Sequence, residues 1–388
     1  MAVRALARVN LAAIERNVAR LRGELADGVG LCAVVKGAGY GHGALPAARA
    51  ALAGGARMLA VATAGEAAEL RDGAISGPIL VMGAVSDEEL PVALGARCEL
   101  VAWSPGFVER LRSAVSRPSG VGLSGTGVGS VRVHVKLDTG MGRLGTRDVD
   151  EAIRVADAVA AGRPELELAG AMTHFASADE DPAFTELQLT RFEPFVSAMR
   201  NRWPGLVVHA ANSAATLREP ASHFDLVRCG IAIYGCDPMN QDAFVHGLEP
   251  ALELTSYVAA VKLARPGDSA GYGRRWTASS ETWVATVPIG YADGIRRALT
   301  NNCEVLIGGR RYPLVGTVSM DNITVALGTD RGPVSCGDPV TIIGADGPER
   351  QTAEEVARRI ETISYEIVCG LTPRVPRVYH RDGAPVER

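Results

Sequence analysis

The feature that most constrains the fold is a repeated alternation between residues 31 and 235, where short runs of β-type apolar residues alternate with helix-length, alanine-rich segments. This pattern is typical of parallel strands joined by crossover helices. Eight such runs are present, and they end at Lys36, Thr63, Gly83, Trp103, Asp138, His174, Asn212 and Ile231. The sequence therefore predicts an α/β fold with a closed (β/α)8 TIM barrel, in which active sites lie at the carboxyl ends of the strands.

Residues with chemically capable side chains collect where these strands end. Polar residues gather wherever a strand meets a loop, so any one of them is weak evidence for a site. Seven together favour an active site at the barrel mouth, and they are Lys36, Lys136, Asp138, His174, Asn212, Ser213 and Arg228.

After about residue 246 the pattern changes to short β-rich runs separated by Gly, Pro and Asp turns, interrupted by one expected helix at 353–363. We therefore expect a barrel domain over residues 1–246 and a mainly β domain over residues 247–388. The N-terminus is expected to form a short strand that enters an amphipathic helix. The Gly- and Ser-rich stretch at 113–130 is expected to be a surface insertion.

Composition narrows the class of protein. A chain of 388 residues with 47% hydrophobic content can bury a large core. A net charge of −4 leaves no basic excess for a nucleic acid partner. No run approaches the roughly 20 apolar residues that cross a bilayer and the N-terminus is not a signal peptide, so we expect a soluble, cytoplasmic protein without a membrane partner. Seven scattered cysteines without a C-x-x-C pair argue against disulfides and against a metal site.

The segment AVVKGAGYGHGA places Lys36 at a strand end, followed by alternating glycines from Gly37 to Gly43 and a helix expected from Ala44. Glycines at such a position let the backbone approach a ligand closely. The segment also matches a degenerate G-x-G-x-x-A dinucleotide pattern. No acidic residue ends the next strand about 20 residues further on, which disfavours a nicotinamide cofactor.

The Lys-x-x-x-Tyr-Gly-His-Gly arrangement that begins at Lys36 resembles the cofactor-lysine motif of alanine racemases, which are fold type III pyridoxal-phosphate enzymes. Further segments agree in order along nearly the whole chain: KLDTGMGRLG at 136–145, MTHFASAD at 172–179, HAANSAAT at 209–216, VRCGIAIYG at 227–235, GYG at 271–273, PIGYADGIRR at 288–297 and SMDNITV at 319–325. The resemblance implies pyridoxal 5'-phosphate as cofactor and interconversion of L- and D-alanine, which supplies D-alanine for peptidoglycan of the cell wall.

Carried over residue by residue, the resemblance implies that Lys36 binds the cofactor covalently and that Tyr40 contacts its phosphate. The covalent bond requires a neutral amine, so the site has to lower a lysine pKa of about 10.4 by desolvation and nearby positive charge. For Ser213 alone a helix N-cap is an alternative that can coexist with phosphate binding. The resemblance completes the phosphate site with Asn212, Ser213, Gly230 and Ile231.

The resemblance places Arg228 against the pyridine nitrogen of the cofactor. A guanidinium does not readily give up its proton, so the ring should stay unprotonated, which makes it a weaker electron sink and limits transamination. An arginine paired to a carboxylate at the barrel mouth is the structural alternative.

Racemisation requires a proton to leave one face of the substrate and another to arrive at the opposite face. The resemblance implies that Lys36 serves one face and that Tyr272 from the neighbouring subunit of a homodimer serves the other. A free tyrosine has a pKa of about 10, so its phenolate has to be stabilised at neutral pH. A chain from Tyr272 through His174 to Arg228 would stabilise it by positive charge. A lone GYG is otherwise typical of a β-turn.

Substrate contacts are implied for four further residues. Arg143 resembles the residue that contacts the phenolic oxygen of the cofactor and the substrate carboxylate. The partner subunit is implied to supply Tyr291, Met320 and Asp321 at the entrance, although Met320 could simply pack and Tyr291 could be interfacial. Lys136 matches a position that is carbamylated in some members.

The chain departs from the family pattern at several positions. A Gly-Ala-Gly sequence from Gly37 to Gly39 replaces the usual Ala-Asn-Ala, with Ala38 at its centre. Ser319 stands where Cys is frequent, and Pro373 stands where some members have a phosphate-binding Tyr. These departures bear on substrate breadth and cofactor affinity more than on reaction type.

Three alternatives to an alanine-specific racemase follow from the same residues. A racemase of serine or of a broader set of amino acids differs by only one small pocket. A related pyridoxal barrel decarboxylase is disfavoured by the GYADG and SMD motifs. A catalytically silent pyridoxal-binding protein would exchange no α-proton of alanine.

Overall fold

The computed structural model describes residues 4–116 and 130–386. The predicted surface insertion therefore lies mostly outside the described residues. The chain forms two compact units that are each discontinuous in sequence. One unit contains Glu15–Gly39 and Ala47–Ile233, and the other contains the chain up to Ile14, the segment Tyr40–Pro46 and the chain from Tyr234 onward.

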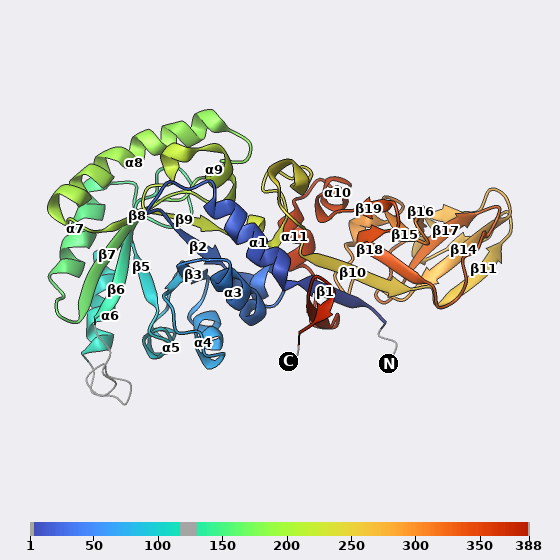
Figure 1. The fold of residues 1–388 in the computed structure, drawn as a ribbon, viewed down its shortest axis with the longest axis horizontal. Helices are drawn as coiled ribbons and strands as arrows, with labels where there is room; N and C mark the ends of the chain where they lie inside the picture. The colour runs from blue at the N-terminus through green and yellow to red at the C-terminus, as the bar shows by residue number, and fades with distance from the viewer. Residues whose placement is uncertain (1–3, 117–129, 387–388) are drawn as a thin grey trace. The chain divides into compact units, whose positions relative to one another are not determined.

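The first unit is a parallel eight-stranded barrel (Figure 1), which confirms the eight predicted strands. Its strands pair in the order β8-β7-β6-β5-β4-β3-β2-β9. Backbone hydrogen bonds from Asp225 to Val208 and from Arg228 to Ala211, both 3.0 Å or less, join β9 to the β8 segment. The strands are β2 (Gly30–Val34), β3 (Met58–Val61), β4 (Ile79–Val81), β5 (Glu99–Ala102), β6 (Val131–Lys136), β7 (Leu166–Met172), β8 (Val207–His209) and β9 (Leu226–Cys229).

Helices cover the outside of this barrel because their apolar residues fall on one face. In α7 the buried residues Ala152, Val155, Ala156 and Val159 follow helical spacing, and Asp148 caps the first turn. The helices that connect strands of the barrel unit are α3 (Ala44–Ala53), α4 (Ala64–Asp72), α5 (Leu90–Gly95), α6 (Pro105–Val115), α7 (Val149–Ala160), α8 (Pro182–Arg202) and α9 (Ser213–Arg218).

The second unit is built on a sheet with the order β11-β14-β17-β16-β15-β18-β10-β1-β20-β21. The N-terminal strand β1 (Leu6–Asn10), which enters helix α1 (Leu11–Arg22) as predicted, pairs with β10 antiparallel and with β20 parallel. The remaining strands are β10 (Leu252–Tyr257), β11 (Ala260–Ala264), β12 (Ser269–Ala270), β13 (Trp276–Thr277), β14 (Thr282–Val287), β15 (Glu304–Ile307), β16 (Arg310–Val315), β17 (Ile323–Gly328), β18 (Pro339–Asp346), β19 (Glu349–Gln351), β20 (Arg377–Arg381) and β21 (Ala384–Pro385).

The single helix predicted at 353–363 is wrong in extent. Two short helices form instead, α10 (Ala353–Arg358) and α11 (Ser364–Cys369). Glu361 lies between them with φ of 54°, which ends the right-handed helix. The β-branched residues Ile360, Thr362 and Ile363 favour helix weakly, which accounts for the break at this point.

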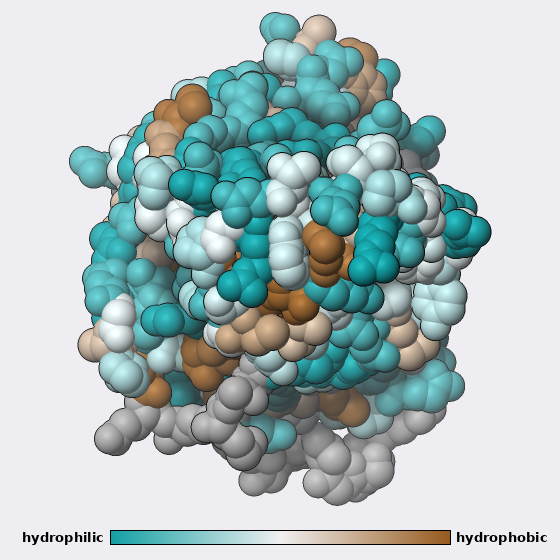
Figure 2. Space-filling model, turned by 90° about the vertical axis from the view of Figure 1, so that its right-hand side faces the viewer, coloured by the Kyte–Doolittle hydropathy of each residue, from teal (hydrophilic) through white to brown (hydrophobic). Residues whose placement is uncertain are grey.

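The surface in Figure 2 is largely hydrophilic, and its apolar side chains occur in small groups. All seven cysteines are free thiols, five of them buried. Within residues 4–116 and 130–386, no group of three or more His, Cys, Asp or Glu residues could hold a metal ion. No helix in the same described ranges has the length and hydropathy to cross a membrane.

Candidate active site

Lys36 follows the barrel strand β2 after one residue, Val35, and opens a short turn of left-handed backbone. Gly37, Ala38 and Gly39 have φ between 53° and 63°, and Tyr40 continues with φ of 50°. Glycine adopts this region without steric cost, which explains two of the departures from the family pattern. The backbone N–H of Gly37 donates to Glu66 Oε1 at 2.6 Å, so the capping residue of α4 also holds the turn.

Arg228 on β9 is the centre of the polar network inside the barrel. Its side chain is buried, and Nη1 contacts His209 Nδ1 at 2.8 Å. Nη2 contacts the carbonyl oxygens of Thr173 and Ala210 at 2.9 Å and His174 Nδ1 at 3.0 Å. No carboxylate contacts Arg228 in these bonds, which disfavours the structural alternative of an arginine paired to an acid.

His174 is neutral in this arrangement. A guanidinium nitrogen has no lone pair to offer, so His174 Nδ1 must accept and its proton must lie on Nε2. Burial and then the charge of Arg228, with smaller effects from Lys136, Arg143 and Lys36, hold the pKa of His174 well below its usual value. His174 therefore presents an Nε2–H donor.

The Nε atom of Arg228 is the exception in this network. It is buried and has no hydrogen-bond partner within the part of the chain that the structure describes. A buried donor without an acceptor costs about 1–3 kcal/mol, and more when the group is charged. An acceptor at this atom would remove that cost.

Lys136 and Arg143 lie close enough to this cluster to affect its titration. Burial, followed by the charges of Arg228 and Arg143, lowers the pKa of Lys136 from 10.5 to about 8. Arg143 is exposed, on a loop that Asp138 shapes by accepting hydrogen bonds from Gly140 and Gly142. Asp138 is therefore a structural residue of this loop.

The predicted phosphate residues meet at the ends of β8 and β9. Ser213 Oγ accepts from Gly230 N at 2.9 Å, and Ile231 follows directly as a fully buried residue. The helix N-cap is Asn212, whose Oδ1 accepts from Ala215 N at 3.0 Å. The capping role considered for Ser213 thus belongs to the preceding residue, because α9 begins at Ser213 itself.

Tyr40 belongs to the other compact unit, together with the segment up to Pro46. Its ring is buried and stacks on Tyr234 with ring centroids 5.2 Å apart. Arg377 Nε donates to Gly41 O at 3.1 Å and ties this segment to β20. The motif that begins at Lys36 is thus divided, with Lys36 in one unit and Tyr40 in the other.

Tyr272, Tyr291 and Met320 are exposed on three hydrogen-bonded segments of the second unit, and the residues are 75%, 42% and 50% accessible, respectively. Thr317 Oγ1 donates to Tyr272 O at 2.6 Å. Tyr291 N donates to the carbonyl oxygen of Ser319 at 3.0 Å, next to Met320.

These loops are held by charged and polar side chains. Asp321 is exposed and contacts Arg374 Nη2 at 2.7 Å. Ser319 donates to Asn322 O at 2.7 Å and accepts from Asn322 N at 3.1 Å, closing a tight turn that a cysteine would bond more weakly. The structure gives no account of Pro373 beyond its place before Arg374.

Sequence reasoning missed three residues of the barrel interior: Glu99, His134 and His209. His134 Nδ1 lies 2.9 Å from His209 Nε2, and His134 Nε2 lies 2.7 Å from Glu99 Oε2. A signal existed, because His134 stands two residues before Lys136 on the same strand and so faces the same side.

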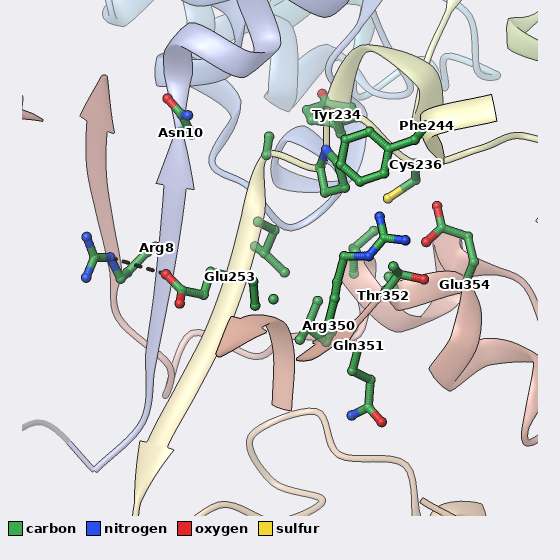
Figure 3. A pocket seen from close by; sticks show the side chains of 18 of the residues that line it. Arg8, Asn10, Tyr234, Cys236, Phe244, Glu253, Arg350, Gln351, Thr352 and Glu354 are labelled. Carbon is green, nitrogen blue, oxygen red and sulfur yellow. Dashed lines mark ion pairs between the residues drawn. The ribbon is translucent and has the colours of Figure 1, made fainter. Parts of the chain in front are cut away.

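A cavity of about 340 Å³ lies in the second unit, and none of the residues predicted for the site lines it (Figure 3). Its lining is mostly apolar and includes Tyr234 and Leu252. Arg350 covers the ring of Phe244 at 4.6 Å, and Glu354 is held by the backbone N–H of Asp237 at 2.8 Å.

Comparison with known proteins gives consistent matches. Residues 9–238 match the family described as alanine racemase, N-terminal domain, and residues 251–379 match alanine racemase, C-terminal domain. The chain is similar to the alanine racemase of Geobacillus stearothermophilus, with 40% identity over 97% of this chain and 93% of that protein. It is 42% identical to that of Symbiobacterium thermophilum, over 96% of each chain.

Solved structures agree over the same length. The alanine racemase from D-cycloserine-producing Streptomyces lavendulae has a TM-score of 0.90 and 37% identity, covering 98% of each chain. The Bacillus anthracis alanine racemase with bound L-Ala-P has a TM-score of 0.88 and 37% identity, covering 100% of this chain and 97% of that one.

Proposed function

Because the chain belongs to the alanine racemase family, whose members are isomerases that use pyridoxal 5'-phosphate, we propose that Lys36 and Tyr272 of the partner subunit are the two bases that interconvert L- and D-alanine. The observation that carries this assignment is the buried guanidinium of Arg228 with its unpaired Nε donor. It supports a ligand with an acceptor nitrogen at the barrel mouth.

The residues present fit the cofactor. A pyridine nitrogen without a proton is an acceptor and would satisfy Arg228 Nε. Burial lowers the pKa of Arg228 only to about 10, so it stays charged at neutral pH and does not protonate its partner. When bound, the cofactor withdraws electrons and makes the α-proton of alanine removable. Ser213, Asn212, Gly230, Ile231 and Tyr40 are proposed to hold its phosphate.

Lys36 is proposed to move the proton on one face of the substrate, because it is the lysine at the end of β2 beside the Arg228 cluster. Its turn is held by Glu66 through Gly37, which limits the positions that the side chain can reach. The exposed guanidinium of Arg143 is proposed to bind the substrate carboxylate, for which its planar fork suits well.

Tyr272 of the partner subunit is proposed to act on the opposite face. His174 carries its proton on Nε2, so it can donate to a phenolate, and Arg228 holds that tautomer from behind. Exposure of 75% makes the Tyr272 side chain accessible to another subunit. Tyr291, Met320 and Asp321 are proposed to line the same entrance from the partner.

The proposed homodimer has a direct test in mixed dimers. A Lys36→Ala subunit and a Tyr272→Ala subunit should form heterodimers with one intact and one doubly defective site, so full exchange restores about a quarter of the parent activity. Purified heterodimers that stay inactive while folded would contradict shared sites.

A matched control uses two substitutions from the barrel unit. Lys36→Ala mixed with Arg228→Ala leaves each barrel with one defect, so no activity should return.

Turnover across a panel of amino acids that includes serine then defines the substrate range, because a methyl-sized pocket discriminates only weakly.

A further inference from the structure

A chain of polar side chains crosses the barrel interior, where apolar layers are the rule. It begins at Arg132 and Glu99, the second residue of β6 and the first of β5, and continues through His134 and His209 to Arg228. Glu99, His134, His209 and Arg228 are 6%, 1%, 0% and 2% exposed. Buried polar groups of this kind are costly unless every hydrogen bond is made.

The donors and acceptors of this chain allow only one direction. Arg228 Nη1 can only donate, so His209 Nδ1 must accept and His209 must carry its proton on Nε2. That proton points to His134 Nδ1, which must therefore accept. His134 then carries its proton on Nε2 and donates it to Glu99. Both histidines are neutral and have the same tautomer.

A glycine on the neighbouring strand β7 leaves space for the His134 ring in this row of polar side chains. The register between β6 and β7 shifts after Val133, so that His134 pairs with Gly170. A Cβ at position 170 would collide with His134 Nδ1 and with the carbonyl oxygen of Val207. Glycine at this position therefore allows the His134 ring to lie where it meets His209.

Glu99 fixes the direction of the chain from its far end. Its Oε1 accepts from Arg132 Nε at 3.0 Å and its Oε2 faces His134 Nε2 at 2.7 Å, so both oxygens must be acceptors. Burial raises the pKa of Glu99, but the hydrogen bond with His134 and the hydrogen bond and charge of Arg132 outweigh it and lower the pKa overall. The carboxylate is thus ionised.

We propose that Glu99 is a positioning residue for Arg228. Glu99 sets the tautomers of His134 and His209, so that the lone pair of His209 Nδ1 accepts a hydrogen bond from Arg228 Nη1. The guanidinium then keeps its orientation, with Nε left to donate to the cofactor. Only this last link rests on the proposed function, since the tautomers follow from the barrel alone.

Glu99→Gln is the sharp perturbation because it keeps the shape and removes one acceptor. If the amide oxygen faces His134, the NH2 group meets Arg132 Nε–H, donor against donor. If the NH2 group faces His134, both imidazoles must reverse and His209 Nδ1–H meets Arg228. The first arrangement places a clash of donors at the partly exposed Arg132, and the second places it at the buried Arg228; Glu99→Asp avoids both.

The test is 15N NMR of the holoenzyme labelled at its seven histidines, which reports which ring nitrogen is protonated. The parent should show His134 and His209 protonated on Nε2 only. Glu99→Gln should shift signals of both rings and lower kcat roughly tenfold with little change in KM, as loss of comparable supporting hydrogen bonds does. Glu99→Asp should keep the parent tautomers.

Glu167→Gln is the matched control, since Glu167 also binds Arg132 but touches neither histidine. It should leave the histidine signals and kcat as in the parent. A parent in which His209 is protonated on Nδ1, or a Glu99→Gln spectrum identical to that of the parent, would overturn the proposal. If Glu99→Gln does not fold, Glu99→Asp and Glu99→Asn repeat the comparison with a shorter side chain.

Altered tautomers with unchanged kcat would overturn only the link to the cofactor. Failure of the proposed function would appear separately, as loss of mixed-dimer complementation with intact histidine signals. The two proposals therefore fail in distinguishable ways.

Discussion

Replacing Lys136 with methionine should stabilise the protein at neutral pH. Lys136 is 3% exposed and its pKa falls from 10.5 to about 8, because burial and two arginines oppose its charge. Each pKa unit corresponds to about 1.36 kcal/mol, so the folded state carries a penalty of about 3 kcal/mol when the amine is protonated. Lys136→Met removes this penalty and keeps an unbranched side chain.

The sign of the pH dependence follows from proton binding. Between about pH 8 and pH 10.5 the unfolded chain binds more protons at this lysine than the folded chain, so stability of the parent rises with pH. As the pH falls from 10.5 towards the folded pKa of about 8, the parent loses this gain in unfolding free energy, because the buried amine becomes protonated. The advantage of Lys136→Met should therefore be full below pH 8 and should vanish towards pH 10.5.

The assay is urea unfolding of parent and variant side by side from pH 7 to 10, in buffers freed of carbon dioxide. Lys262→Met is the control, because Lys262 is exposed on β11 and its replacement should change stability little. A variant that is no more stable at pH 7, or whose advantage persists unchanged to pH 10, would refute this reasoning. Bicarbonate should stabilise the parent alone if it carbamylates Lys136, with a 13C label then found on that residue.

Three further substitutions test other parts of the site. Arg228→Lys should destabilise the barrel by about 2 kcal/mol in urea unfolding, because one ammonium cannot replace contacts to four acceptors. Ser213→Ala should lower the unfolding free energy by about 1–3 kcal/mol and weaken cofactor retention on dialysis, since it orphans the buried N–H of Gly230. Ala38→Gly should raise the unfolding free energy by about 0.5–1 kcal/mol, and the thermal midpoint with it, because it removes the steric strain of an alanine with left-handed backbone (φ 53°). An unchanged or lower midpoint for Ala38→Gly would show that this strain is not relieved.

The barrel strands and the polar residues at their carboxyl ends could be predicted because parallel strands joined by helices give a strong sequence pattern. Eight apolar runs with helices between them admit few topologies, and the polar residue at each strand end marks the mouth. Lys36, His174 and Arg228 were predicted as site residues in this way. Their hydrogen-bond partners could not be predicted, because this requires the register between neighbouring strands, which the alternation of strands and helices alone does not define.

The interior chain escaped prediction for a related reason. Glu99 and His134 lie within strands, where a polar residue on an apolar run can face either side. Their contact joins β5 to β6, and the contact of His134 with His209 passes β7 at a register shift that no local pattern announces. The glycines after Lys36 indicated a turn with positive φ. The positive φ of Ala38 and Tyr40 depends on tertiary structure and could not be predicted from these residues.

The unpaired donor on Arg228 also links the protein's survival to its supply of cofactor. If Arg228 Nε donates to the cofactor as proposed, a chain that folds without the cofactor keeps a charged N–H facing no acceptor, whereas a loaded chain gains that bond along with the binding energy itself. Open forms are what proteases attack, so the unloaded fraction should be degraded first. In a cell short of vitamin B6, the amount of this enzyme would then fall together with the share that is active.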